Sequence, residues 1–296
     1  KGSLVSVQQI AFAYEVAQGF VGLRRHIPGV RIGNTEGMTY FGVKTEQSVV
    51  DAAVIQHLLY KHKTDLLIEL GTYCGGSAVY YSKMMRDYNP KATVVTVDVT
   101  DPRSGFCFQN DASKKPIWSE MLQAGWIVSM VGHLAKDRKM QARLRQYARA
   151  ARSVMVIDDG NHLAPSVIQL FHLLSTVVTP GNYYILQDTR LDFDCAYAQL
   201  TTGPSDYCKW ILDVGGPWYA AEQLKNTSVF TQDRSVEFWA ITQHPGGYLK
   251  RNDEQRVSVD SYSPPHAKGA TRSDRNEKAK AAAGRKRRGD RWAAGG

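Results

Sequence analysis

The chain has 296 residues, a formal net charge of +9, and 43% hydrophobic and 22% charged residues. This composition is ordinary for a soluble globular protein, and the length suffices for one large α/β domain or two small domains. Its apolar runs are too short to span a bilayer, and Gln8, Gln9 and Glu15 interrupt any signal-peptide pattern. We therefore expect a cytoplasmic protein without membrane contact. Because the chain begins at Lys1 rather than Met, we also expect a segment upstream of it.

Residues 1–60 precede the first strongly apolar strand pattern and look mainly helical. We expect this lead-in to cover the sheet or to form a lid over the substrate. Strand and helix patterns then alternate along the chain. Short apolar runs predict five strands, at residues 65–70, 93–98, 126–131, 154–157 and 183–186.

Helical patterns occupy residues 77–86, 136–151 and 164–177, between the predicted strands. This alternation predicts a Rossmann-like, doubly wound α/β domain with a mostly parallel sheet, which we assign to residues 61–260. Two later apolar runs, residues 229–230 and 236–241, are separated by a short polar turn. They predict an antiparallel hairpin at one edge of the sheet.

The last segment, residues 261–296, carries most of the positive charge. Residues 267–296 hold ten Lys/Arg and three Asp/Glu, which leaves a net charge of only +2 for the rest of the chain. A segment so poor in large apolar residues cannot offset its ordering entropy, so we predict a disordered basic tail. Its run at residues 285–288 is a candidate contact for nucleic acid or an anionic surface, or a targeting signal, but a solvated tail without a partner is the simpler explanation.

Four cysteines occur, at Cys74, Cys107, Cys195 and Cys208. They form no C-x-x-C pair and no zinc-ligand spacing. Four cysteines in a chain of this length do not indicate a disulfide scaffold, and we expect a reducing compartment.

A glycine-containing loop follows the first predicted strand and opens a helix. Its sequence runs from Glu69 to Ser77 and reads E-L-G-T-Y-C-G-G-S. Ligands of doubly wound sheets bind outside the carboxyl ends of the strands, and glycines there let the backbone approach a ligand closely. The spacing is not the G-x-G-x-x-G of a pyrophosphate loop, and there is no lysine for a phosphate.

An acidic loop of this kind suits a cofactor that carries a cationic sulfonium and an ammonium group, as S-adenosylmethionine does. Asp98 ends the second predicted strand at the distance where an acid accepts hydrogen bonds from ribose hydroxyls. The plain structural alternatives are a capping or surface role for Glu69 and a turn role for Asp98. The expected cofactor-binding residues are Glu69, Gly71, Thr72, Gly75, Gly76, Ser77 and Asp98.

A second polar cluster follows the fourth and fifth predicted strands. Asp159 and His162 come after the fourth strand, and Gln187 and Asp188 after the fifth. Because these loops meet at the same sheet edge, we expect the side chains to converge. Asp159, Gln187 and Asp188 would suit Mg²⁺, which prefers oxygen ligands and lowers the pKa of a bound hydroxyl. His162 is an alternative general base, and ordinary turn chemistry or helix capping is the simpler alternative for the whole cluster.

Taken together, these motifs resemble the cephalosporin hydroxylase and rhamnosyl O-methyltransferase family of class I S-adenosylmethionine-dependent methyltransferases. The resemblance covers residues 38 to 190, about half of the chain. It rests on the loop from Leu67 to Ala78, on Asp159 to His162 and on Thr179 to Thr189, with looser matches at Phe41 to Val43 and Val54 to Gln56. It implies S-adenosylmethionine binding and O-methyl transfer, with Asp159, His162 and Asp188 as candidate catalytic residues and Mg²⁺ held at the later strand ends.

The sequence departs from the family pattern at two acids. Gln187 stands where the family has a carboxylate, and the D-S-D triplet becomes Asp159-Gly160-Asn161. These neutral groups weaken a divalent-cation site. The first functional hypothesis is methylation of a hydroxyl on a sugar or natural product by a protein that can form homo-oligomers.

Three alternatives remain at this stage. The first is an RNA or protein methyltransferase that holds its substrate with the basic tail, the only part of the chain that suggests nucleic acid. The second is a cofactor-binding homologue without activity, which Gln187 motivates. The third, a nicotinamide oxidoreductase, fits worst because the glycine spacing is wrong for it.

Overall fold

The computed structural model describes residues 38–103, 107, 115–201, 203–225, 227–237 and 242–252. These all belong to one compact unit. The predicted tail and residues 1–37 of the predicted lead-in therefore lie outside the described residues. Within the described ranges, none of the helices combines the length and the apolar character that crossing a bilayer requires.

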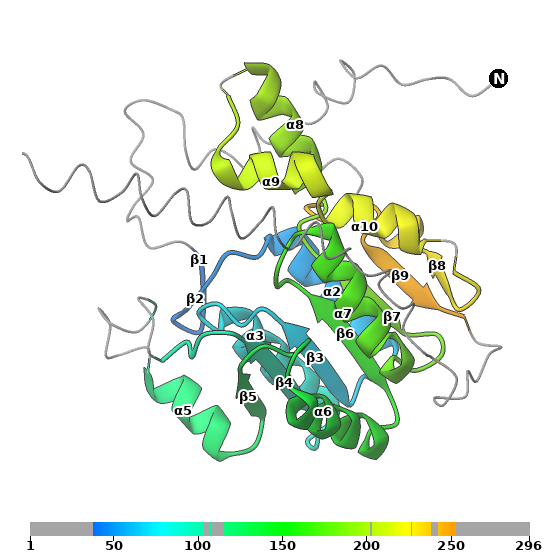
Figure 1. The fold of residues 1–296 in the computed structure, drawn as a ribbon. Helices are drawn as coiled ribbons and strands as arrows, with labels where there is room; N and C mark the ends of the chain where they lie inside the picture. The colour runs from blue at the N-terminus through cyan, green and yellow to red at the C-terminus, as the bar shows by residue number, and fades with distance from the viewer. Residues whose placement is uncertain are drawn as a thin grey trace, which may run out of the picture. The chain divides into compact units, whose positions relative to one another are not determined.

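The described part contains nine strands and eight α-helices, with two short 3₁₀ helices (Figure 1). The strands are β1 Met38–Tyr40, β2 Val43–Thr45, β3 Leu66–Leu70, β4 Thr93–Asp98, β5 Ile127–Val131, β6 Val154–Asp158, β7 Tyr183–Leu186, β8 Phe230–Gln232 and β9 Tyr248–Arg251. The helices are α2 Val49–Lys61, α3 Gly76–Tyr88, α5 Lys115–Gln123, α6 Arg138–Ala150, α7 Ala164–Leu174, η2 Ser175–Val177, α8 Leu191–Thr201, α9 Asp206–Val214, α10 Pro217–Leu224 and η3 Arg234–Val236.

Seven strands form one mixed sheet in the order β5-β4-β3-β6-β7-β9-β8. The first five are parallel, and β9 and β8 add an antiparallel pair at the β7 edge. Within this sheet, the chain forms β3 first and continues outward to β4 and β5. It then crosses to β6 on the other side of β3. The sheet therefore has a topological switch point beside β3, where ligands bind in doubly wound folds.

Helices cover both faces of this sheet and form two separate cores. On one face, α2, α3 and α5 pack on the sheet around residues such as Ile55, Val79 and Trp118. On the other face, α6, α7 and α10 pack around Leu144, Phe171 and related side chains. The central strands are buried on both faces, which explains their uninterrupted apolar sequences.

The five predicted parallel strands are confirmed to within one residue at each end, and so is the mostly parallel Rossmann-like fold. The edge hairpin is present, but the described residues test only the start of its second predicted strand. The partner of β8 is β9, whereas Arg234–Val236 is a 3₁₀ helix and residues 238–241 are outside the described part.

The mainly helical lead-in is only partly correct. The α2 helix is present, with Ser48 as its N-cap, but β1 and β2 form a short antiparallel hairpin before it. The cysteines also differ from expectation, because disulfides join Cys74 to Cys107 and Cys195 to Cys208.

Candidate active site

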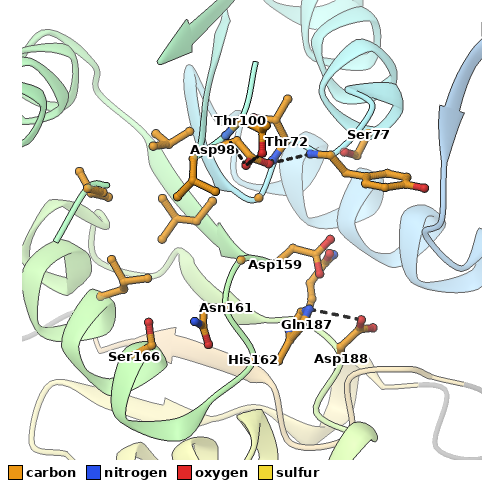
Figure 2. A pocket seen from close by; sticks show the side chains of 18 of the residues that line it. Thr72, Ser77, Asp98, Thr100, Asp159, Asn161, His162, Ser166, Gln187 and Asp188 are labelled. Atoms are coloured by element: carbon orange, nitrogen blue, oxygen red, sulfur yellow. Dashed lines mark hydrogen bonds and ion pairs between the residues drawn. The ribbon is translucent and has the colours of Figure 1, made fainter. Parts of the chain in front are cut away.

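A pocket of about 910 Å³ opens at the carboxyl ends of the parallel strands. The loops after β3, β4, β5, β6 and β7 line it, together with the segment before α2 and part of α9. Figure 2 shows Thr72, Ser77 and Asp98 on one side of this pocket and the cluster of His162, Gln187 and Asp188 on the other. The two groups of residues predicted from the sequence therefore face one cavity.

The glycine loop lies directly against neighbouring backbone. Gly71 has a φ of +91°, and a β-carbon there would overlap the carbonyl oxygen of Asp159. At Gly76, a β-carbon would come within 2.5 Å of the Lys44 carbonyl oxygen. Glycine is therefore required for this packing, which leaves the turn open toward the pocket. Gly71, Thr72, Gly76 and Ser77, which are four of the expected cofactor-binding residues, line the pocket.

Gly75 and Glu69 do not line the pocket. Gly75 adopts a φ of +84° at the start of α3, with a β-carbon position 2.5 Å from the ring of Trp118. Glu69 is buried under the loop, where it accepts a hydrogen bond from the Thr96 hydroxyl at 2.6 Å and another from Ser77. Burial raises the pKa of Glu69 to about 7. The structure therefore gives both residues a role in shaping the loop.

Asp98 lies at the end of β4 and lines the pocket. Its Oδ2 accepts hydrogen bonds from the backbone amides of Thr72 at 2.9 Å and Tyr73 at 3.0 Å, and its Oδ1 accepts one from Thr100 at 3.0 Å. The Thr100 hydroxyl also donates to Oδ1, at 3.4 Å, and this longest of the four bonds is the one that a ribose hydroxyl would replace. Asp98 thus connects the loop after β4 to the glycine loop.

The second cluster converges as the sequence predicts. Asp159, His162 and Asp188 each present one ligand atom, and these atoms lie within 4.8 Å of one another. Nε2 of His162 lies 3.9 Å from Oδ2 of Asp188. Because β6 and β7 are adjacent parallel strands, their following loops bring these side chains together.

The surroundings of this cluster shift the pKa values of Asp159 and His162. Removal from water raises the pKa of Asp159 well above its usual value, and the negative charge of Asp188 raises it further. Burial also lowers the pKa of His162, against the opposing effect of Asp188. A neutral imidazole next to two crowded carboxylates is able to accept a proton.

Gln187 adds an amide to the cluster. It is buried, and its Nε2 has no hydrogen-bond partner within the described structure. Buried polar atoms normally have partners, so this N–H donor indicates an acceptor, such as a hydroxyl oxygen, that the protein does not itself supply. The pKa of Asp159 is raised by burial and by the charge of Asp188, and a bound cation would let Asp159 ionise. The donor set of Asp159, Gln187 and Asp188 therefore fits a divalent metal ion.

Sequence reasoning missed several residues of the site. His244 lines the pocket from a segment 56 residues after Asp188, and its Nδ1 accepts a hydrogen bond from the Asp188 amide at 2.8 Å. Tyr207 and Trp210 line it from α9, although their side chains remain 40% and 62% exposed. No local pattern marks these positions, because only the tertiary fold brings them to the strand ends.

The strand order, the glycine loop and the polar cluster at the strand ends define an S-adenosylmethionine-dependent methyltransferase. The family model described as rhamnosyl O-methyltransferase/CmcI matches residues 33–252. The chain belongs to this family, and its reaction is the O-methylation of a small-molecule hydroxyl.

Curated relatives agree with this assignment. A rhamnosyl O-methyltransferase of Mycobacterium tuberculosis strain H37Rv is 26% identical over 223 residues, which is 72% of this chain and 78% of that protein. A rhamnosyl O-methyltransferase of Mycobacterium leprae is 24% identical over 173 residues, which is 56% of this chain and 66% of that protein.

Two solved structures are also similar. A CmcI structure with SAH has a TM-score of 0.49 and 18% identity, over 78% of this chain and 90% of that chain. The MycE methyltransferase of the mycinamycin biosynthetic pathway, in complex with Mg, SAH and mycinamycin VI, has a TM-score of 0.37 and 16% identity, over 72% of this chain and 51% of that chain.

Proposed function

We propose that the protein methylates a hydroxyl group of a sugar or a sugar-bearing natural product, using Asp159, His162 and Asp188 as its reactive cluster. The observation that carries this proposal is the convergence of these side chains within 4.8 Å, in the same pocket that the glycine loop lines. A methyl acceptor bound between the glycine loop and this cluster would have its hydroxyl next to the cluster and would face the methyl donor.

The residues that line the pocket have separate roles in methyl transfer. The glycine loop and Asp98 hold the methyl donor, with Asp98 accepting a hydrogen bond from a ribose hydroxyl. His162 takes the proton from the acceptor hydroxyl as its oxygen forms a bond to the methyl carbon and the carbon–sulfur bond breaks. Asp188, at 3.9 Å from Nε2 of His162, stabilises the imidazolium that results. The products are the methyl ether and S-adenosylhomocysteine.

Asp159, Gln187 and Asp188 are the residues that would hold Mg²⁺. When bound, the metal ion supplies a lower pKa and a fixed orientation for the acceptor hydroxyl. Only two of these three groups are carboxylates, so we expect weaker binding of the cation than by an all-carboxylate site.

The acceptor class is inferred from the aromatic wall of the pocket. Tyr207 and Trp210 present exposed rings from α9. Exposed aromatic rings that line a pocket provide rigid, partly apolar contact surfaces, which suit the apolar face of a sugar ring. The rhamnosyl O-methyltransferases among the relatives carry a sugar in their printed names.

The test is methyl transfer from labelled S-adenosylmethionine to an alkyl rhamnoside, with and without Mg²⁺. Asp159→Asn and Asp188→Asn should each lower turnover by about 100-fold or more, while they leave donor binding intact. Asp87→Asn is the matched control, because Asp87 is exposed on α3 and does not line the pocket. Full turnover by both site variants would contradict the proposal.

The basic tail motivates a second candidate, an RNA or protein acceptor. Residues 1–260 carry a net charge of only +2, so such a substrate would depend on the tail. Deletion of residues 262–296 distinguishes the two, because it abolishes methylation of an anionic polymer and leaves that of a small sugar unchanged.

Assembly and compartment remain predictions. A homo-oligomer is tested by light scattering of the purified chain. Cytoplasmic placement, predicted from the sequence, has the two disulfides against it.

A further inference from the structure

Asp188 has an unusual backbone conformation. Its φ is +54°, in the left-handed region that residues other than glycine seldom adopt. Such a conformation persists only where neighbouring groups hold it, and it is common at functional sites. At the end of β7, it determines the direction in which the Asp188 carboxylate leaves the chain.

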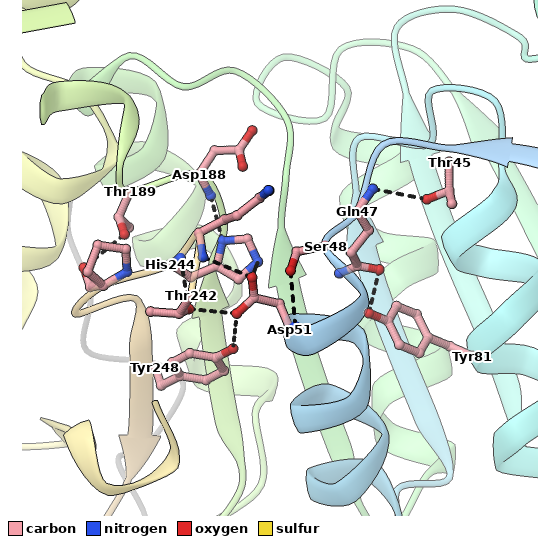
Figure 3. A network of polar contacts seen from close by, with 12 residues as sticks. Thr45, Gln47, Ser48, Asp51, Tyr81, Asp188, Thr189, Thr242, His244 and Tyr248 are labelled. Carbon is pink, nitrogen blue, oxygen red and sulfur yellow. Dashed lines mark hydrogen bonds and ion pairs between the residues drawn. The ribbon is translucent and has the colours of Figure 1, made fainter. Parts of the chain in front are cut away.

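The amide of Asp188 is held by one side chain. It donates a hydrogen bond to Nδ1 of His244 at 2.8 Å, and both residues are labelled in Figure 3. His244 is only 2% exposed. Because Nδ1 accepts this hydrogen bond, the ring proton belongs on Nε2, which has no hydrogen-bond partner in the described residues and lies 3.9 Å from Oδ2 of Asp51.

Asp51 fixes the segment that carries His244. This fully buried carboxylate of α2 accepts hydrogen bonds from the Thr242 hydroxyl at 2.6 Å, the Gln243 amide at 2.8 Å and the Tyr248 hydroxyl at 3.3 Å. The His244 amide in turn donates to the Thr242 hydroxyl at 3.0 Å. The ring of His244 therefore has little freedom to move away from Asp188.

Two further hydrogen bonds join the same two segments beside the bond from Asp188 to His244. Thr189 donates through its hydroxyl to the Pro245 carbonyl at 2.8 Å, and the Arg190 amide donates to the Gln243 carbonyl at 3.3 Å. These bonds place the two segments side by side. Of the bonds between these two segments, the one from the Asp188 amide to His244 acts on the residue with the left-handed φ, and the Asp188 carbonyl accepts a local hydrogen bond from the Leu191 amide at 2.9 Å.

We propose that His244 is a positioning residue, which fixes the left-handed conformation of Asp188 and thereby directs its carboxylate toward Asp159 and His162. The proposal rests on the proposed role of Asp188 in methyl transfer. His244 does not touch the reacting atoms in this role, because its Nδ1 is engaged by the Asp188 backbone and its Nε2 faces Asp51.

Two substitutions separate this role from simple packing. In His244→Asn, an oxygen on the γ-carbon stands near the place of Nδ1 and can accept the same hydrogen bond. In His244→Gln, the amide reaches the place of Nε2 and leaves the Asp188 amide without an acceptor. His57→Asn is the control, because His57 is an exposed histidine of α2.

The readouts are amide hydrogen exchange of the peptide that contains Asp188, measured without ligands, and kcat with the alkyl rhamnoside. His244→Gln should exchange faster there and lose about 10- to 100-fold in kcat, with unchanged affinity for S-adenosylmethionine. His244→Asn should resemble the wild type in both. Equal exchange and equal kcat for the two variants would overturn the proposal.

A measurement on the wild type covers the case in which His244→Gln does not fold. The ¹⁵N chemical shifts of His244 should show an unprotonated Nδ1, and a proton on Nδ1 would overturn the proposal. These shifts and the exchange data need no substrate. If the wild type folds in this way but neither binds S-adenosylmethionine nor transfers methyl groups, the proposed function fails separately from the placement of Asp188.

Discussion

The carbonyl of Asp159 lies directly over Gly71, so that a β-carbon on Gly71 would overlap its oxygen. The contact joins the loop after β6 to the loop after β3, and the Asp159 amide donates to the Leu70 carbonyl at 2.8 Å. The glycine loop and the cluster of Asp159, His162 and Asp188 are therefore joined by direct backbone contacts, and a displacement of one should displace the other.

Gly71→Ala should disturb both the glycine loop and the cluster of Asp159, His162 and Asp188. The new methyl group meets the Asp159 backbone, and the φ of +91° is unfavourable for alanine, so we expect a loss of about 3 kcal/mol in the free energy of unfolding. The affinity for S-adenosylmethionine should also fall, and titration calorimetry measures this affinity. Gly125→Ala is the control, because Gly125 has a φ of +68° but nothing within 4 Å of its β-carbon position. Equal losses for the two variants would show that the contact is unimportant.

Asp98→Asn should weaken S-adenosylmethionine binding by about 10- to 100-fold, since charged hydrogen bonds contribute about 1.5–3 kcal/mol each. The amide group cannot accept from Thr72, Tyr73 and Thr100 together as the carboxylate does. Titration calorimetry gives the dissociation constant. Unaltered affinity would mean that Asp98 serves neither the loop nor the cofactor.

Glu69 makes stability depend on pH in a predictable direction. Its pKa is about 7 in the folded protein and about 4.5 in the unfolded chain, so the folded state holds an extra proton between these values. Stability should therefore fall as the pH rises from about 4.5 to about 7, by about 3 kcal/mol in total. Urea unfolding across this range should show a smaller decrease for Glu69→Gln. Asp158, whose pKa burial also raises to about 7, contributes similarly in both proteins. Identical slopes would remove Glu69 as the cause.

Trp210→Ala should raise KM for an alkyl rhamnoside by about 10-fold, because a stacked ring is among the larger contributions to binding. The free energy of unfolding and the affinity for S-adenosylmethionine should not change, since the side chain is 62% exposed. Leu200→Ala is the control, because Leu200 is 78% exposed and does not line the pocket. An unchanged KM would remove α9 from the acceptor site.

Both disulfides should be detectable by alkylation and mass spectrometry. The protein denatured without a reductant should show no reactive thiol, and after reduction it should show all four. Loss of the Cys195–Cys208 bond in Cys195→Ser/Cys208→Ser should lower stability by about 2–4 kcal/mol. Four reactive thiols before reduction would instead support the reducing compartment predicted from the sequence.

The parallel strands were predictable because burial on both faces leaves an uninterrupted apolar run, as in Leu66–Leu70. The strands β1 and β2 were missed because three residues are too few to show a period. The acids at strand ends were found because parallel topology brings such ends together. His244 was not found, since its contact with Asp188 spans 56 residues and depends on the antiparallel pairing of β9 with β7.

That pairing also determines when a newly made chain can become active. The segment from Thr242 to β9 is among the last of the described fold to be synthesised, yet it supplies the residue that holds Asp188. The donor loop, both carboxylates and His162 are all translated earlier. A nascent chain can therefore contain every reactive group before β9 has been made, and with the role proposed for His244 it becomes competent only once β9 has paired with β7.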